Sequence, residues 1–136
     1  MGEPAFKIKN IIEQNNIYVF SANFALYGDM SNRVMSILGD ITPSLEIYSI
    51  DEAFMDFTGI SGYLEFASRI KERVTKSTGI PISIGVAKTK TLAKIANHIA
   101  KKYSTNNVFV MTKNKEILKI NSDIKQKKIN LISNKH

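Results

Sequence analysis

The sequence contains no cysteine in its 136 residues, and no apolar run approaches the roughly 18 residues that indicate a membrane span. The missing cysteine excludes disulfides, thiolate zinc sites and cysteine nucleophiles. The N-terminus has no basic region followed by an apolar stretch, so it does not read as a signal peptide. These absences predict a cytoplasmic protein that does not engage a membrane.

Charge is divided unevenly along the chain. Residues 1–87 carry seven Lys and Arg against ten Asp and Glu, a net charge of −3, whereas residues 88–136 carry twelve Lys against two acidic residues, a net charge of +10. This polarity is typical of proteins that handle polyanions such as nucleic acids. A solvated lysine-rich surface is the alternative interpretation of the same composition.

Hydrophobic periodicity predicts an α+β fold. From residue 45 onward the expected order is β-β-α-β-α-β, with two amphipathic helices against one mixed or antiparallel sheet whose other face is open to a ligand. The expected helices cover residues 6–15, 21–42, 61–77 and a segment after Thr89, and the expected strands cover 17–20, 45–58 in two parts, 81–87 and 106–112.

Two adjacent carboxylates, Asp51 and Glu52, interrupt an apolar, β-prone stretch. Regular strand geometry would send them to opposite faces, so only a turn or a strand end lets both reach one cation. Carboxylate oxygens suit Mg²⁺, which fills its remaining positions with water and substrate phosphate. Taken alone, the pattern favours a solvated Asp-Glu turn in a hairpin over a metal site. Asp56 is expected to face solvent or to cap a turn.

Lysines follow one edge of the helix expected after Thr89, without carboxylates nearby in sequence. Such an edge can bind phosphates as point charges, helped by backbone donors at the helix N-terminus, although a plain solvated face is the alternative. Gly85, just before this helix, marks either a close approach of backbone or an ordinary strand glycine. The edge, with the spacing i, i+4, i+7 and i+11, comprises Lys90, Lys94, Asn97 and Lys101.

The stretch around the carboxylates resembles the catalytic motif of Y-family translesion DNA polymerases. Its string is Tyr48-Ser49-Ile50-Asp51-Glu52-Ala53-Phe54-Met55-Asp56. Residues 79–102 are similar to the palm strand and following helix of that family, and residues 21–35 are particularly similar to its UmuC branch. The resemblance runs from about residue 2 to 112 in the family's order and favours the metal-binding interpretation of the two carboxylates.

The resemblance implies a polymerase-palm-like (ferredoxin-like) mixed or antiparallel sheet with two helices on one face, preceded by a helical remnant of the fingers. It implies a two-metal nucleotidyl-transfer site using Mg²⁺, in which Asp51 and Glu52 match two metal ligands and Lys101 matches the lysine that reaches the triphosphate of the incoming dNTP. The implied partners are primer–template DNA and other translesion-polymerase subunits, in DNA repair and the SOS response. The lysines expected near the DNA backbone are Lys88, Lys90 and Lys94.

The sequence also departs from the family pattern. Nothing before Ile17 matches the first-strand Asp-x-x-x-Phe/Tyr motif that carries a third metal carboxylate, and the finger Tyr and Arg, the thumb and the little finger have no counterpart. We therefore expect a fingers remnant (residues 1–20), a palm (21–112) and a partly disordered lysine-rich tail (113–136), together forming a fragment that is inactive alone. The alternative is a non-catalytic module that binds DNA or a polymerase subunit. The uncovered sheet edge also predicts oligomerisation or poor solubility.

Overall fold

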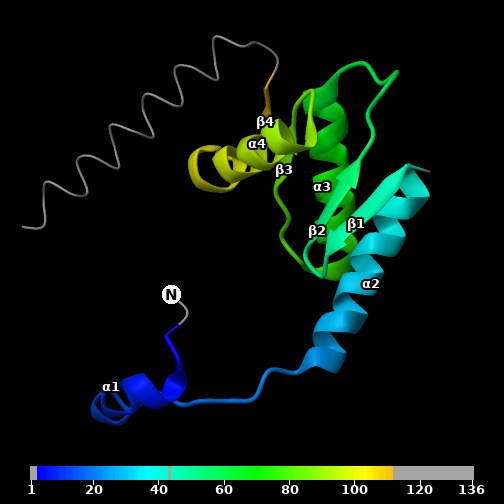
Figure 1. Cartoon of the computed structure of the whole chain (residues 1–136). Coiled ribbons are helices and arrows are strands. Elements are labelled where there is room, and N and C mark those ends of the chain that lie inside the picture. The colour runs from blue at the N-terminus through cyan, green and yellow to red at the C-terminus, as the bar shows by residue number, and fades with distance from the viewer. Residues whose placement is uncertain (1–2, 43, 112–136) are drawn as a thin grey trace, which may run out of the picture.

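The computed structural model describes residues 3–42 and 44–111, so the predicted tail (113–136) lies outside the described residues. The order β-β-α-β-α-β after residue 45 is as predicted (Figure 1). No helix in the described part of the chain is long and apolar enough to cross a bilayer. In chain order the elements are the 3-10 helix η1 (Ala5–Ile8), α1 (Lys9–Gln14), α2 (Phe24–Ile41), β1 (Leu45–Ser49), β2 (Glu52–Met55), α3 (Tyr63–Thr78), β3 (Ile84–Val86), α4 (Lys90–Tyr103) and β4 (Val108–Val110).

The predicted strand over residues 17–20 is wrong, because this segment is irregular and exposed. A β-prone run forms a strand only where another strand pairs with it, and none in the described residues does so. The helix after this segment begins later than expected. Asn23 rather than Ser21 caps α2, and its side-chain oxygen accepts a hydrogen bond from the backbone N–H of Leu26 at 3.0 Å.

The four strands form two separate pairs instead of the single sheet that the sequence predicted. β1 and β2 form an antiparallel hairpin in which Leu45 lies opposite Met55, with an irregularity between Ile47 and Ser49. β3 and β4 are parallel, with Ile84 opposite Val108. The structure is therefore α+β with mixed strand directions, as predicted, but its sheet is divided.

α2 and α3 pack on one face of the strands (Figure 1), whereas the sequence predicted that α3 and α4 would share one face. The side chain of Ile84 packs into the core between these helices and the strands, whereas the next residue, Gly85, faces α4. Because successive strand residues point to opposite faces, α4 covers the other face of β3. A smaller core lies under α4. The main core is built around Val34, Met35, Leu38, Ile70 and Val74.

Gly85 is a close-approach point, which decides between the two interpretations of this glycine. A Cβ atom there would lie 2.0 Å from the backbone nitrogen of Asn97 and 2.6 Å from the carbonyl oxygen of Ala93. Only a residue without a side chain lets the α4 backbone rest directly on β3. This contact fixes the position of the lysine-bearing helix relative to the strands.

Candidate functional site

The two predicted carboxylates lie at the turn of the β1–β2 hairpin. Asp51 stands in the turn and Glu52 opens β2, and both line one open cavity of about 880 Å³. The Ser49 hydroxyl donates a hydrogen bond to the Asp51 carboxylate at 2.8 Å. On α2, the Ser31 hydroxyl donates to the carbonyl oxygen of Ile50 and so ties the turn to that helix. The turn thus places both acids beside one cavity. This is the condition under which the sequence analysis expected both to reach one cation.

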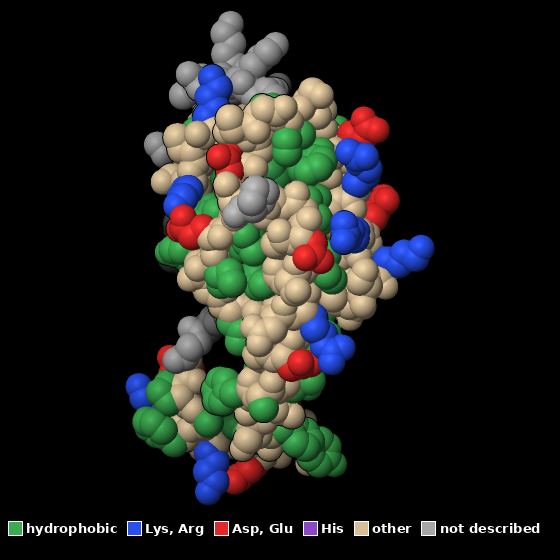
Figure 2. Space-filling view, turned by 90° about the vertical axis from the view of Figure 1, so that its right-hand side faces the viewer, with side chains coloured by type: hydrophobic (Ala, Val, Ile, Leu, Met, Phe, Trp, Pro, Cys, Tyr) green, Lys and Arg blue, Asp and Glu red, His purple; other side chains and the backbone are tan. Residues whose placement is uncertain are grey.

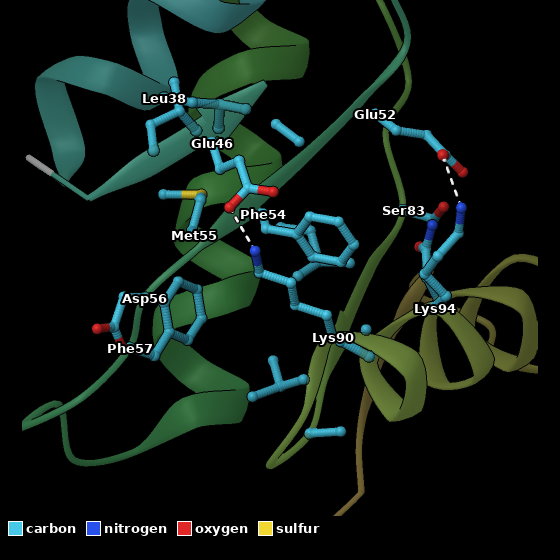
Figure 3. Close-up of a pocket in the computed structure, with 18 of the residues that line it drawn as sticks. Leu38, Glu46, Glu52, Phe54, Met55, Asp56, Phe57, Ser83, Lys90 and Lys94 are labelled. Atoms are coloured by element: carbon cyan, nitrogen blue, oxygen red, sulfur yellow. Dashed lines mark hydrogen bonds and ion pairs between the residues drawn. The ribbon is translucent and has the colours of Figure 1, made fainter. Parts of the chain in front are cut away.

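Three predicted lysines line the same cavity: Lys88, Lys90 and Lys94. The ammonium of Lys94 lies 3.0 Å from a carboxylate oxygen of Glu52, and the ammonium of Lys90 contacts the carboxylate of Glu46 (Figure 3). No carboxylate lies near these lysines in sequence, and the partners of Lys90 and Lys94 come from a hairpin more than forty residues away. The hydrogen bond to Glu52 raises the pKa of Lys94.

Two aromatic rings of the hairpin lie beneath these lysines. Tyr48 and Phe54 meet edge to face, with centroids 5.6 Å apart. The Lys94 ammonium lies 4.3 Å from the centre of the Tyr48 ring and the Lys90 ammonium 5.4 Å from that of Phe54. Each ammonium therefore interacts with one carboxylate and one aromatic ring, a combination that orients it over the cavity.

Sequence reasoning missed the contributions of Glu46, Tyr48 and Phe54 to this site. Strand alternation was the available signal, because residues two apart share a face. Glu46 and Tyr48 are two apart on β1, Glu52 and Phe54 are two apart on β2, and Glu46 lies opposite Phe54 in the register. The hairpin face that carries Glu52 thus combines acids and aromatic rings.

Of the two other predicted residues, Lys101 lies outside the cavity and Asp56 lines it. Lys101 stands in the last turn of α4, about 10 Å along the helix axis from Lys94, and does not line the cavity. Asp56 lines the cavity and caps a turn, as expected: its carboxylate accepts hydrogen bonds from the hydroxyl and the backbone N–H of Thr58, at 2.6 and 2.8 Å. These two hydrogen bonds hold the pKa of Asp56 below its ordinary value, and the bond from the hydroxyl has the larger effect.

The carboxylates of Asp51 and Glu52 suit a cation that takes only some of its ligands from the protein. No group of three His, Asp or Glu residues close enough to hold a metal ion occurs within residues 3–42 and 44–111. Proteins usually bind Mg²⁺ through one or two carboxylates and leave its remaining positions to water and phosphate oxygens, so Asp51 and Glu52 are the residues that could hold it here. The lysines around the cavity suit the phosphate groups of such a shared ligand.

Comparisons with known proteins match this part of the chain. The profile of the impB/mucB/samB family matches residues 1–98. Protein UmuC of Salmonella typhimurium is 49% identical over 105 residues, which is 75% of this chain and 25% of that protein. DNA polymerase IV 2 of Mesorhizobium japonicum is 39% identical over 104 residues, 74% of this chain and 25% of that protein.

A solved structure shares the fold. The crystal structure of a DinB family error-prone DNA polymerase from Sulfolobus solfataricus aligns with a TM-score of 0.67 and 30% identity, over 82% of this chain and 34% of that one. The predicted resemblance to Y-family polymerases, and to their UmuC branch in particular, is confirmed. The chain spans only about a quarter of the length of the sequence relatives it matches.

Proposed function

Because this chain belongs to the impB/mucB/samB family, we propose that it carries part of the nucleotidyl-transfer site of an error-prone, UmuC-like translesion DNA polymerase of the cytoplasm, acting in DNA repair and the SOS response. One observation carries this proposal: Asp51 and Glu52 share a cavity with Lys88, Lys90 and Lys94. In this proposal residues 1–20 are a remnant of the fingers and residues 21–112 are the palm.

The residues divide into two roles. Asp51 and Glu52 hold Mg²⁺, which when bound lowers the pKa of the attacking hydroxyl and offsets charge on the triphosphate. Lys88, Lys90 and Lys94 bind backbone phosphates of DNA without reading sequence. Lys101, farther along α4, binds the triphosphate of the incoming dNTP.

Within the described residues, no third His, Asp or Glu lies close enough to Asp51 and Glu52 to share a metal ion with them. Two carboxylates suit one Mg²⁺, but a two-metal site without its third carboxylate holds its ions weakly and fixes their position relative to a primer poorly. We therefore propose that this chain alone does not sustain templated synthesis.

Divalent-cation binding tests the acid pair. Isothermal titration of the whole chain with Mn²⁺ and with Mg²⁺ is expected to show weak binding that Asp51→Asn and Glu52→Gln each reduce. Glu72→Gln is the matched control, because Glu72 is an exposed acid of α3 that does not line the cavity. Equal binding by all four proteins would remove the metal role of Asp51 and Glu52.

Primer extension tests the proposed incompleteness. The chain is incubated with Mg²⁺, dNTPs and a primed template, either undamaged or abasic. No extension is expected from the chain alone. Sustained synthesis that Asp51→Asn abolishes would establish the site but refute the claim that two carboxylates are insufficient.

A non-catalytic nucleic-acid-binding role is the second candidate, favoured by the net charge of +10 over residues 88–136. Binding through three lysines gives a slope of about −3 for log K against log salt on duplex DNA. A slope of this size that persists in an Asp51→Ala, Glu52→Ala double variant supports this role. Absence of binding at low salt discards it.

A further inference from the structure

A polar residue interrupts the buried stripe of α2. The buried residues of this helix are Val34, Met35 and Leu38, which lie on one side of it at helical spacing. Ser31 continues the same stripe toward the N-terminus, because it precedes Val34 by three residues and Met35 by four. An apolar side chain is the usual choice at such a position. The hydroxyl present there has a specific partner, the carbonyl oxygen of Ile50.

Ser31 also marks the place where α2 leaves the body of the molecule. Nearer the N-terminus, Phe24 is 78% exposed and Tyr27 is 50% exposed. In Figure 1 this first part of α2 extends beyond the strands, and in Figure 2 the N-terminal part of the chain stands away from the body with hydrophobic side chains gathered on it. On the other side of Ser31, Val34 belongs to the main core. The hydroxyl of Ser31 therefore lies about one turn from the firmly packed part of the helix.

The turn that carries Asp51 does not have the conformation that tight hairpins favour. It consists of two residues, Ile50 and Asp51, between the paired residues Ser49 and Glu52. Two-residue hairpin loops favour type I′ or II′ turns, and both types need a positive φ. In the described residues, positive φ occurs only at two asparagines and three glycines elsewhere in the chain. Other turn types splay the strands, and the pairing is indeed irregular between Ile47 and Ser49. The local sequence therefore favours this turn only weakly.

Two hydroxyl groups beside the turn support it. The hydroxyl of Ser49 donates to the Asp51 carboxylate at 2.8 Å and so orients that side chain. The hydroxyl of Ser31 acts on the backbone, because the carbonyl of Ile50 belongs to the planar peptide group that joins Ile50 to Asp51. Fixing this peptide group restricts the φ angle of Asp51. Of the two bonds, the one from Ser31 connects the turn to a different element of the fold, nineteen residues away in sequence.

We infer that Ser31 is a positioning residue for the two carboxylates. Its hydroxyl holds the peptide group between Ile50 and Asp51 in the orientation that presents Asp51 and Glu52 to the cavity. Loss of one hydrogen bond changes an equilibrium about two- to tenfold, so without this bond the turn populates other conformations. A ligand that needs the presented conformation then binds more weakly, by up to the same factor. The consequence for metal binding rests on the proposed function, whereas the hold on the turn does not.

Relaxation of the backbone ¹⁵N nuclei in the metal-free chain tests the hold on the turn. In wild type the order parameters of Asp51 and Glu52 are expected near about 0.85, the value of rigid backbone. In Ser31→Ala they are expected to fall below about 0.6, or these two amides to show new exchange on the microsecond-to-millisecond timescale. Ser36→Ala is the matched control, because Ser36 is an exposed serine of the same helix, about 140° around its axis from Ser31. Unchanged relaxation in Ser31→Ala, or an equal change in both variants, overturns the inference.

Unfolding and Mn²⁺ binding separate positioning from a purely structural role. The free energy of unfolding of Ser31→Ala is expected to stay close to that of wild type, because the helix propensity of alanine opposes the loss of one hydrogen bond. Calorimetry is expected to show Mn²⁺ affinity lowered about two- to tenfold in Ser31→Ala and unchanged in Ser36→Ala. A loosened turn with unchanged Mn²⁺ affinity would remove the positioning role. A wild-type chain that binds no Mn²⁺ would refute the proposed metal site instead, and the ¹⁵N relaxation would still decide whether Ser31 holds the turn.

Discussion

Replacing Gly85 by alanine tests how α4 is positioned. The added Cβ would lie 2.0, 2.5 and 2.6 Å from three backbone atoms of α4, those of Asn97, Ala96 and Ala93. Unlike the end of a flexible side chain, these atoms cannot rotate aside. Because carbon atoms pack at about 3.5 Å or more, α4 must move about 1.5 Å from β3.

The size of the effect follows from that displacement. A gap of 0.5–1 Å already forfeits about a quarter to a half of the dispersion energy between facing atoms, and overpacking a core costs about 1–3 kcal/mol. Both penalties act on the contacts that hold α4 to β3. We therefore expect Gly85→Ala to lower the free energy of unfolding by about 3 kcal/mol or more, or to abolish the cooperative transition.

Urea unfolding followed by circular dichroism at 222 nm measures this change. Gly28→Ala is the matched control, because Gly28 lies inside α2 and a Cβ there meets nothing within 4 Å. Its expected effect has the opposite sign, a stabilisation of about 0.5–1 kcal/mol from the higher helix propensity of alanine. The proposed close contact is refuted if Gly85→Ala unfolds within about 0.5 kcal/mol of wild type.

Three further predictions concern single side chains. Lys94→Met frees Glu52 from its ammonium partner. Calorimetry is expected to show Mn²⁺ binding that is tighter by no more than about fivefold, because ion pairs exposed to solvent are weak. Unchanged affinity would contradict this. Thr58→Val removes the hydroxyl that most lowers the pKa of Asp56. The free energy of unfolding is expected to fall at pH values above the ordinary carboxyl pKa, and the difference from wild type is expected to vanish as the pH drops through the lowered pKa. Unfolding measured over a range of acidic pH would show this. Asn23→Ala is expected to cost about 1 kcal/mol in thermal or urea unfolding through loss of the α2 cap, whereas an unchanged midpoint would assign that cap no role.

Local patterns in the sequence predicted most of the elements, because local physics decides them. Thr89 caps α4, Gly79 ends α3, and the apolar side chains of α3 repeat at helical spacing on its buried face. The wrong predictions concern contacts between residues that are far apart in sequence. Residues 17–20 have the composition of a strand, but composition does not determine whether a partner strand is available to pair with them.

In the candidate site, too, local motifs could be predicted from the sequence and long-range contacts could not. The Asp51-Glu52 dipeptide and the lysine spacing on α4 were visible as motifs, and the structure brings them to one cavity. The pairing of Lys94 with Glu52 was not visible, because it depends on the close contact at Gly85 and on the hairpin register. Gly85 itself was noticed, but its two interpretations could be separated only by the position of the α4 backbone.

The ion pair between Lys94 and Glu52 has a consequence for any ligand that uses both residues. An ammonium that turns toward a phosphate leaves Glu52 without its counter-charge, and a divalent cation that binds Glu52 releases the ammonium. Each event makes the other more favourable, so cation binding and phosphate binding at this cavity are thermodynamically coupled, and the coupling is the same in both directions. Because the pair is exposed to solvent, this coupling is weak. For the proposed site we therefore expect a ligand that brings phosphate and a divalent cation together to bind better than either one alone.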